Sequence, residues 1–201
     1  MRVHQKSPWY RSTWISWIIY IFLVLTISDA FPREWKWYYI PSSSNLPAIL
    51  VGDVVFALKI KPGSNIAQGA IVIFRPLGAM DKLWVKRVVG FAGDHVQMRK
   101  GVLFINGSIT SRTPISSYLV DKNGRNLETE RYSEAIPSGA THDILKETDN
   151  GWANNTGEFV VSNGTFFVMG DNRDDSADSG FAGAVGYVDV ENVVGKATWI
   201  F

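Results

Sequence analysis

The stretch Leu83-Trp-Val-Lys-Arg-Val-Val-Gly90 has the composition of a β-strand, because branched and aromatic side chains dominate it and few residues are polar. Side chains alternate between the two faces of a strand, so Lys86 shares the face of Trp84, and Arg87 falls on the other. One basic side chain is then expected to face the core and its neighbour to face away. A Lys–Arg pair on an edge strand is the other interpretation, and periodicity alone does not separate the two.

Short runs of the same kind recur along the chain after residue 53. Turn sequences such as Lys61-Pro-Gly, Asn106-Gly and Asn163-Gly separate them. A hydrophobic fraction of 46% excludes general disorder. The sequence has neither a βαβ alternation nor a useful amphipathic helix here, so we predict a mainly β, antiparallel, sheet or barrel-like domain. The predicted strands are Val54–Ile60, Ile71–Arg75, Leu83–Val89, His95–Arg99, Val102–Ile105, Phe159–Val161, Phe166–Met169 and Val193–Ile200.

Residues 108–158 have a different composition, being polar and containing several Gly and Asn residues. Within them only Thr141–Lys146 has the pattern of a strand. The length of this segment argues against a structureless connection. We therefore predict that residues 108–158 form an insertion of extended hairpins or loops in the β domain.

The N-terminus combines a basic head with an apolar run. Residues 1–13 carry a charge of +3 without an acid, which leaves −2 for the remainder of a chain of net charge +1. The apolar run begins at Trp14, and counting to Phe31 brings it to the low end of the roughly 17 to 25 residues that span a bilayer. With the positive-inside rule this predicts a cytoplasmic basic tail (1–13), a transmembrane anchor (14–31) and an exported domain (32–201).

Two other interpretations of the apolar run stay open. Ser28-Asp29-Ala30 has the small-x-small pattern of a signal-peptide cleavage site. A helix buried in the core is the third possibility, and the basic flank disfavours it.

Composition excludes several kinds of function. A net charge near zero without a basic stripe argues against a nucleic-acid partner. The chain has no cysteine, so it has no disulfide and no thiolate metal site. His95 and His142 are predicted to lie on the surface, which disfavours a Ser/His/Asp triad and a histidine metal site. We expect no metal and no cofactor.

Residues Ile40–Asp53, the serine turn, place three consecutive serines between Pro41 and Pro47. The two prolines bend and stiffen the chain where it displays hydroxyl groups, which suits a presented nucleophile as well as an ordinary polar turn. A lysine can activate a serine when burial lowers the pKa of its amine. Lys86 is the candidate, since it lies inside a strongly apolar strand.

Residues 170–179, the acidic loop, form a third polar cluster, with four aspartates in Gly-Asp-Asn-Arg-Asp-Asp-Ser-Ala-Asp-Ser. The EF-hand pattern of calcium loops requires a Gly and a terminal Glu at positions that fail here. We interpret the loop as a network of turns around Arg173 that orients other residues.

Together these stretches resemble the type I signal peptidases, membrane-anchored serine/lysine endopeptidases that remove signal peptides from exported preproteins. The matching segments occur in the order of the family and span nearly the whole predicted exported part. They are Ile40–Pro47 with Gly52-Asp53, Gly69–Phe74, Lys86–Asp94, and Gly170–Ser179 with Gly195-Lys-Ala197.

The resemblance implies a role for individual residues. Ser44 corresponds to the nucleophile and Lys86 to the general base, while the Ser42 hydroxyl and the Ser44 backbone N–H correspond to the oxyanion hole. Ser176 corresponds to the hydroxyl that orients the lysine amine. The supporting network would consist of Asp171, Arg173 and Asp178, with Arg87 as the ion-pair partner of Asp171.

The resemblance also implies partners and a location. The partners would be preprotein signal peptides and membrane lipid. A substrate would lie extended along a strand edge and place small side chains in shallow pockets. The chain would cross the bacterial cytoplasmic (inner) membrane once, with its N-terminus in the cytoplasm and its catalytic domain on the outer, periplasmic side.

The chain departs from the usual family pattern at a few positions. Asn45 replaces Met, Ala48 replaces Thr, and Gly180 stands where an arginine commonly pairs with Asp178; Ala70 and Ala92 replace the usual Asp and Pro. A specialised relative that matures a narrow substrate, such as a pilin or conjugation protein, is therefore an alternative. An inactive, membrane-tethered β module that binds peptides is another.

Overall fold

The structure, a computed structural model, describes residues 16–18, 20, 34–61, 64–122, 124–148, 151–180 and 185–201. The predicted basic tail lies outside these residues, and so does most of the predicted anchor, of which residues 16–18 and 20 are helical. None of the helices in the described part of the chain has the length and apolar character to cross a membrane. The chain divides into two compact units, residues 1–35 and 36–201. The second unit contains the β domain.

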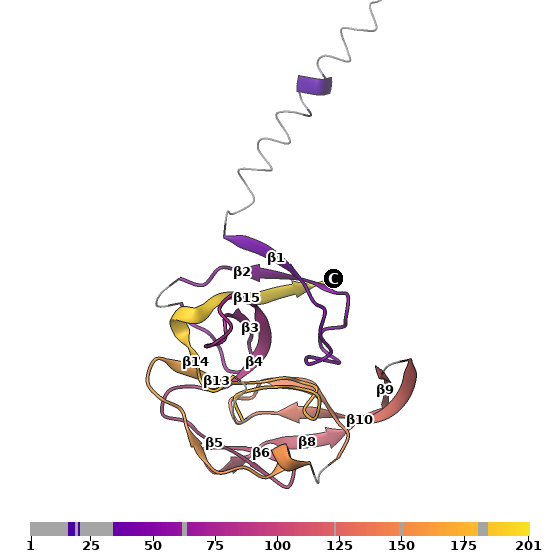
Figure 1. Cartoon of the computed structure of the whole chain (residues 1–201), viewed down its shortest axis with the longest axis vertical. Helices are drawn as coiled ribbons and strands as arrows, with labels where there is room; N and C mark the ends of the chain where they lie inside the picture. Colours follow the sequence, from indigo (N-terminus) through magenta and orange to yellow (C-terminus); the bar gives the residue numbers. More distant parts are fainter. Residues whose placement is uncertain are drawn as a thin grey trace, which may run out of the picture. The chain divides into compact units, whose positions relative to one another are not determined.

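The largest sheet described for the β domain has seven strands in the order β1-β2-β15-β3-β4-β13-β14 (Figure 1). The strands in this sheet pair antiparallel wherever a register is defined. Their bounds are β1 (Trp35–Tyr39), β2 (Val54–Leu58), β3 (Ile71–Phe74), β4 (Trp84–Gly90), β13 (Thr165–Met169), β14 (Val188–Asp189) and β15 (Val193–Ile200).

The described part of the domain contains two further, smaller sheets. One has the order β12-β5-β6-β7, and in the other β10 pairs with β8, β9 and β11. Two short 3₁₀ helices, η1 (Trp152–Asn154) and η2 (Val190–Asn192), lie between strands. The remaining strands are β5 (His95–Arg99), β6 (Val102–Ile105), β7 (Ser108–Ile109), β8 (Ser111–Pro114), β9 (Tyr118–Lys122), β10 (Arg125–Ala135), β11 (Thr141–Lys146) and β12 (Phe159–Val160).

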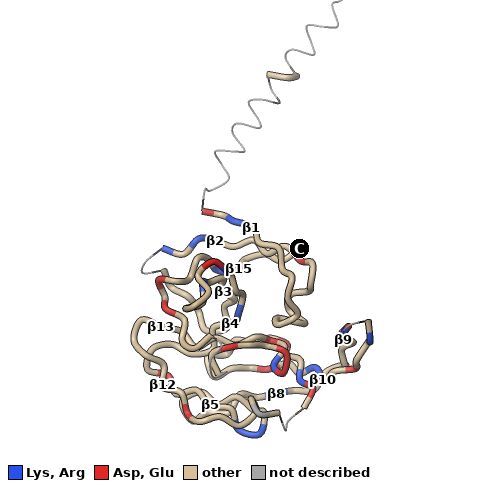
Figure 2. The backbone as a smooth tube through the Cα atoms, viewed as in Figure 1, with Lys and Arg blue, Asp and Glu red and all other residues tan. Residues whose placement is uncertain are grey.

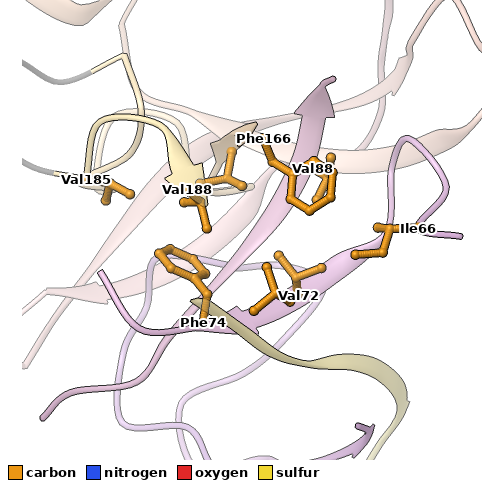
Figure 3. Close-up of a cluster of buried hydrophobic side chains, with 9 residues drawn as sticks. Ile66, Val72, Phe74, Val88, Phe166, Val185 and Val188 are labelled. Atoms are coloured by element: carbon orange, nitrogen blue, oxygen red, sulfur yellow. The ribbon is translucent and has the colours of Figure 1, made fainter. Parts of the chain in front are cut away.

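The mainly β, antiparallel architecture is confirmed, and each of the eight predicted runs contains a strand. Branched and aromatic side chains from these strands fill the core. The cluster in Figure 3 packs side chains of β3, β4, β13 and β14 together, with Phe74 and Val88 fully buried. A second cluster lies between β4–β13 and β5–β6, where Phe167 contacts Phe159 with ring centroids 5.3 Å apart.

The insertion contains more regular structure than the sequence indicates. We predicted one strand in it, yet β7, β8, β9 and β10 are also strands, and β10 alone is 11 residues long. Its first four residues are exposed, so polar side chains occupy both faces and remove the alternation that marks a half-buried strand. Figure 2 shows both signs of charge along β9 and β10.

Strand β4 is buried on both faces from Lys86 onward. The expectation that one basic side chain would face away is therefore wrong, because Arg87 is buried as well as Lys86. Strands β3 and β13 flank β4 within the sheet, and Asp171 of the acidic loop and the Gly69 carbonyl are the polar partners of Arg87. Burial on both sides of β4 brings two cations into the domain interior, where each needs a specific environment.

Candidate active site

The serine turn is held in place by backbone hydrogen bonds before any side chain contributes. The Ile40 N–H donates to the Asp53 carbonyl at 2.9 Å, and the Gly52 N–H donates to the Ile40 carbonyl at 2.8 Å. Ile49 is fully buried among apolar side chains of β2 and β3. The two ends of the turn are therefore fixed to each other, and the serines between them are partly accessible to solvent.

Ser42, Ser44 and Lys86 line one pocket of about 320 Å³. Apolar and aromatic side chains make up much of its wall, including Ile73, Leu83 and Trp84. The ammonium group of Lys86 lies 5.7 Å from the centroid of the Trp84 ring. The pocket thus combines hydroxyl groups with an amine on a mostly apolar surface.

Lys86 is only 3% exposed. Burial lowers the pKa of Lys86 to about 8, while the carboxylates of Asp178, Asp171 and Asp175 act in the opposite direction. A substantial fraction of the amine is therefore neutral at mildly alkaline pH. A neutral amine in a pocket with hydroxyl groups can accept a proton.

The acidic loop holds the serine turn from the other side. The Asn172 N–H donates to the Ser44 carbonyl at 3.1 Å, and the Ser43 hydroxyl donates to Asp175 at 2.8 Å. Gly170 lies so close that a Cβ atom there would be 2.4 Å from the Ser44 carbonyl oxygen and 2.2 Å from Ser176 Oγ. A side chain at Gly170 would displace the loop from the turn.

The hydroxyl groups assigned by resemblance have the following partners. The Ser44 N–H donates to Ser42 Oγ at 3.3 Å, so the two groups expected to form an oxyanion hole are adjacent and bonded to each other. Ser176 Oγ is buried, and within the described part of the chain it has no hydrogen-bond partner. The contact from Ser176 to the lysine amine is therefore not formed in this structure.

Two buried arginine–carboxylate ion pairs support the acidic loop. The Arg87 guanidinium donates to both carboxylate oxygens of Asp171, at 2.7 and 2.6 Å, which is the pair implied by resemblance. Arg173 instead donates to both oxygens of Glu134, a fully buried residue of β10. Fork-shaped Arg–carboxylate pairs fix direction as well as distance. The insertion therefore supplies a counter-ion to the acidic loop.

His142 lies beside both ion pairs, and its predicted surface position is wrong. Its Nε2 atom lies 3.5 Å from Glu134 and 3.9 Å from Asp171, because β11 packs next to the acidic loop through the pairing of Leu145 with Asn172. Burial lowers the pKa of His142 to about 2, and the charges of Arg87 and Arg173 add to this effect. His95 does lie on the surface, paired with Glu158 at 3.0 Å.

Asp178 is a buried carboxylate in the field of Lys86 and Arg173. Burial raises the pKa of Asp178 to about 6, although both cations act to lower it. Its Oδ1 atom accepts a hydrogen bond from the Gly180 N–H at 3.1 Å. A backbone N–H group is therefore a direct donor to this buried carboxylate.

Sequence reasoning missed the contribution of the insertion. Lys146 is buried and donates to Asn154 at 2.7 Å and to Asp174 at 3.3 Å. Asp174 also accepts the N–H groups of Glu147 and Thr148, at 2.7 and 3.2 Å. In the sequence, Lys146 is marked only as the basic last residue of a predicted strand, and no pattern indicates that Glu134 is buried or contacts the site.

A β domain that brings serine hydroxyls and a buried, partly neutral lysine amine into one pocket has the groups of a serine hydrolase. Comparison with known proteins makes this class specific. The family model described as signal peptidase, peptidase S26, matches residues 11–201, and the chain belongs to this family of serine endopeptidases. The family is normally associated with membranes in bacteria.

Two relatives from Rickettsia with the same name support the assignment. The chain is 30% identical to the signal peptidase I of Rickettsia typhi over 92% of its own length and 77% of that protein. It is 27% identical to the signal peptidase I of Rickettsia canadensis, over 100% of this chain and 84% of that one. A crystal structure of a signal peptidase I from Enterococcus faecalis is 26% identical, with a TM-score of 0.38 over 67% of this chain and 98% of that chain.

Proposed function

We propose that this signal peptidase cleaves signal peptides from exported preproteins with Ser44 as nucleophile and Lys86 as general base. The observation that carries the proposal is that both residues line one pocket in which Lys86 is buried and has a pKa near 8. Ser44 Oγ would attack the scissile carbonyl carbon while the Lys86 amine takes its proton. The same ammonium group would then protonate the leaving amine, which makes a histidine unnecessary.

The developing oxyanion would be stabilised by the Ser44 N–H and the Ser42 hydroxyl. These groups are bonded to each other in the free protein, so a bound carbonyl oxygen would replace Ser42 Oγ as the acceptor of the N–H. The Ser42 hydroxyl would then turn its proton toward the same oxygen. Ser176 would complete the site by turning its hydroxyl toward the lysine amine, because this buried hydroxyl has no hydrogen-bond partner among the described residues.

The substrate would be an extended peptide with small side chains before the cleaved bond. Apolar walls around the pocket support this assignment, because they offer contact area but few polar partners. The β13 ladder along β4 ends at Arg87, so the N-terminal part of β4, from Trp84 to Lys86, has no partner strand from β13. An extended peptide can add to such an edge through main-chain hydrogen bonds.

Variants of the two central residues test this mechanism. With a synthetic peptide that contains a small-x-small cleavage site, Ser44→Ala and Lys86→Met should each lower kcat by at least about 10³-fold, since each removes a covalent or proton-transfer role. The substituted chains should unfold at the wild-type temperature or above it, because Lys86→Met removes a buried cation. Cleavage that persists in both variants, or wild-type protein that binds the peptide without cutting it, would support the inactive peptide-binding module.

A dedicated relative with one substrate is the second candidate, and the buried polar Asn45 in the pocket wall favours it. A panel of unrelated preproteins separates the two. We expect turnover of several members of the panel, and turnover of a single pilin-like or conjugation substrate would favour the dedicated enzyme.

We also propose that residues 14–31 anchor the chain in the cytoplasmic membrane as a single span, with residues 1–13 inside and the β domain outside. The basic head and the apolar run support this orientation. Exposed aromatic side chains on β1 and β15, such as Trp37, Tyr39 and Trp199, would contact the lipid surface. Protease added to intact spheroplasts should digest the β domain and spare an N-terminal tag, and protection of the domain would contradict this topology.

A further inference from the structure

Asn45 carries the amide side chain next to Ser44, and it is only 2% exposed. Its Nδ2 donates to the Val85 carbonyl oxygen at 2.7 Å. Val85 is the residue before Lys86, and both Asn45 and Val85 line the same pocket as Ser44 and Lys86. A single hydrogen bond thus joins the residue beside the serine to the residue beside the lysine.

The hydrogen bonds that the serines of the turn make with distant residues reach a different element. Ser44 accepts from Asn172, and Ser43 donates to Asp175, so both of these bonds reach the acidic loop. The bond from Asn45 reaches strand β4 instead, close to the point where its ladder with β13 ends at Arg87. It therefore connects the turn to the strand that carries Lys86.

The oxygen of the amide argues against a role in packing alone. Asn45 Oδ1 is buried, and it has no hydrogen-bond partner within the part of the chain that the structure describes. A buried acceptor without a donor is costly, and an apolar side chain of similar volume would avoid that cost. The benefit of an asparagine at this position must come from the donor that contacts Val85.

We infer that Asn45 is a positioning residue that sets the spacing of Ser44 and Lys86 through its hydrogen bond to the Val85 carbonyl. This inference rests on the proposed Ser44/Lys86 mechanism. Proton transfer requires the serine hydroxyl and the amine within hydrogen-bond reach, and small displacements of reacting groups lower rates severely. The hydrogen bond from the Asn45 side chain holds the serine turn and strand β4 at a fixed separation before substrate binds.

Asn45→Leu in the full-length chain is the direct test, with a small-x-small signal peptide as substrate. We expect kcat to fall about tenfold or more while KM stays within about twofold, because the reacting groups are misplaced but the peptide-binding edge is kept. The midpoint of thermal unfolding should change little, since removal of the unpaired Oδ1 offsets the loss of the donor to the Val85 carbonyl. Asn45→Asp, which keeps the shape and loses the donor, should show the same loss of kcat at the alkaline plateau.

Gln68→Met is the matched control. The Gln68 side-chain amide donates to another carbonyl of β4, that of Val89, at 2.6 Å, so the variant removes the same kind of bond from the same strand. It should keep the wild-type kcat. Wild-type kcat in Asn45→Leu, a rise in KM alone, or an equal loss in Gln68→Met would overturn the inference. A wild-type chain that cleaves nothing would instead overturn the proposed function on which it rests.

Discussion

Lys86 combines a buried amine with three carboxylates close enough to influence it. Burial disfavours the charged form and lowers its pKa, whereas Asp178, Asp171 and Asp175 favour the charged form. The acidic loop therefore limits how far the pKa falls. The result, a pKa of about 8, leaves the amine partly neutral at physiological pH without making it a permanently neutral group.

This balance predicts a pH profile for peptide cleavage. Because the proposed base is the neutral amine, kcat/KM should rise about tenfold per pH unit below pH 8 and level off above about pH 9. Asp178→Asn removes a negative charge that raises the pKa of Lys86, so the midpoint should move to lower pH. The profile can be measured with the peptide substrate between pH 6 and 10.

Asp143→Asn is the control for the profile. Asp143 pairs with Arg131 in the insertion and is not among the carboxylates that act on Lys86. The pH profile of Asp143→Asn should therefore have the same midpoint as that of the wild type. A wild-type midpoint near pH 6.5 would indicate a histidine. A midpoint that moves to higher pH in Asp178→Asn would contradict the role of Asp178 as a carboxylate that raises the pKa of Lys86.

Among the elements, the acidic loop has the most varied contacts. Its residues bind the serine turn through Asn172 and strand β4 through Asp171. They bind the insertion through Arg173 and Asp174. Each aspartate in this short loop thus has a separate partner. A change in the loop would reach the turn and the strand at the same time.

The sequence predicted a network of turns around Arg173 in this loop, because the spacing of its residues fails the EF-hand pattern. It predicted the strands equally well wherever apolar side chains alternate or run together, as in β4 and β15. Patterns local to the chain were sufficient for these elements.

The insertion shows where local patterns fail. Glu134 reaches Arg173 across 39 residues, and nothing near Glu134 in the sequence marks it as buried. Strand β10 consists largely of charged and polar residues that are stabilised by pairing with β8, β9 and β11. The burial of His142 has the same origin, because only the packing of β11 on the acidic loop encloses it. These are effects of tertiary packing, and the local alternation of apolar and polar residues along a strand does not contain them.

At the scale of the whole molecule, two buried groups give the stability of the domain opposite dependences on pH. The pKa of His142 is about 2 in the folded chain and about 6.5 in an unfolded one, so below pH 6.5 only the unfolded chain takes up this proton. Stability then falls as the pH falls. The pKa of Asp178 is raised to about 6, so between about pH 6 and pH 4 the folded chain takes up the proton first, and stability rises.

The two contributions should nearly cancel between pH 4 and 6, and removing one group should expose the other. For each group the expected slope is about 1.4 kcal/mol per pH unit. Relative to wild type, His142→Gln should therefore gain about this much free energy of unfolding for each unit that the pH falls from 6 to 4. Asp178→Asn should lose a similar amount over the same interval. Urea unfolding of the full-length chain at pH 6, 5 and 4 measures both differences.

His95→Gln is the control for this prediction, because His95 is 46% exposed and pairs only at the surface with Glu158. Its stability difference from wild type should depend little on pH compared with that of His142→Gln. Parallel curves for His142→Gln and wild type would mean that the imidazole takes up its proton equally in the folded and unfolded chains. In that case His142 would have to reach solvent in the folded state, and the packing of β11 against the acidic loop would be looser than the buried ion pairs beside it imply.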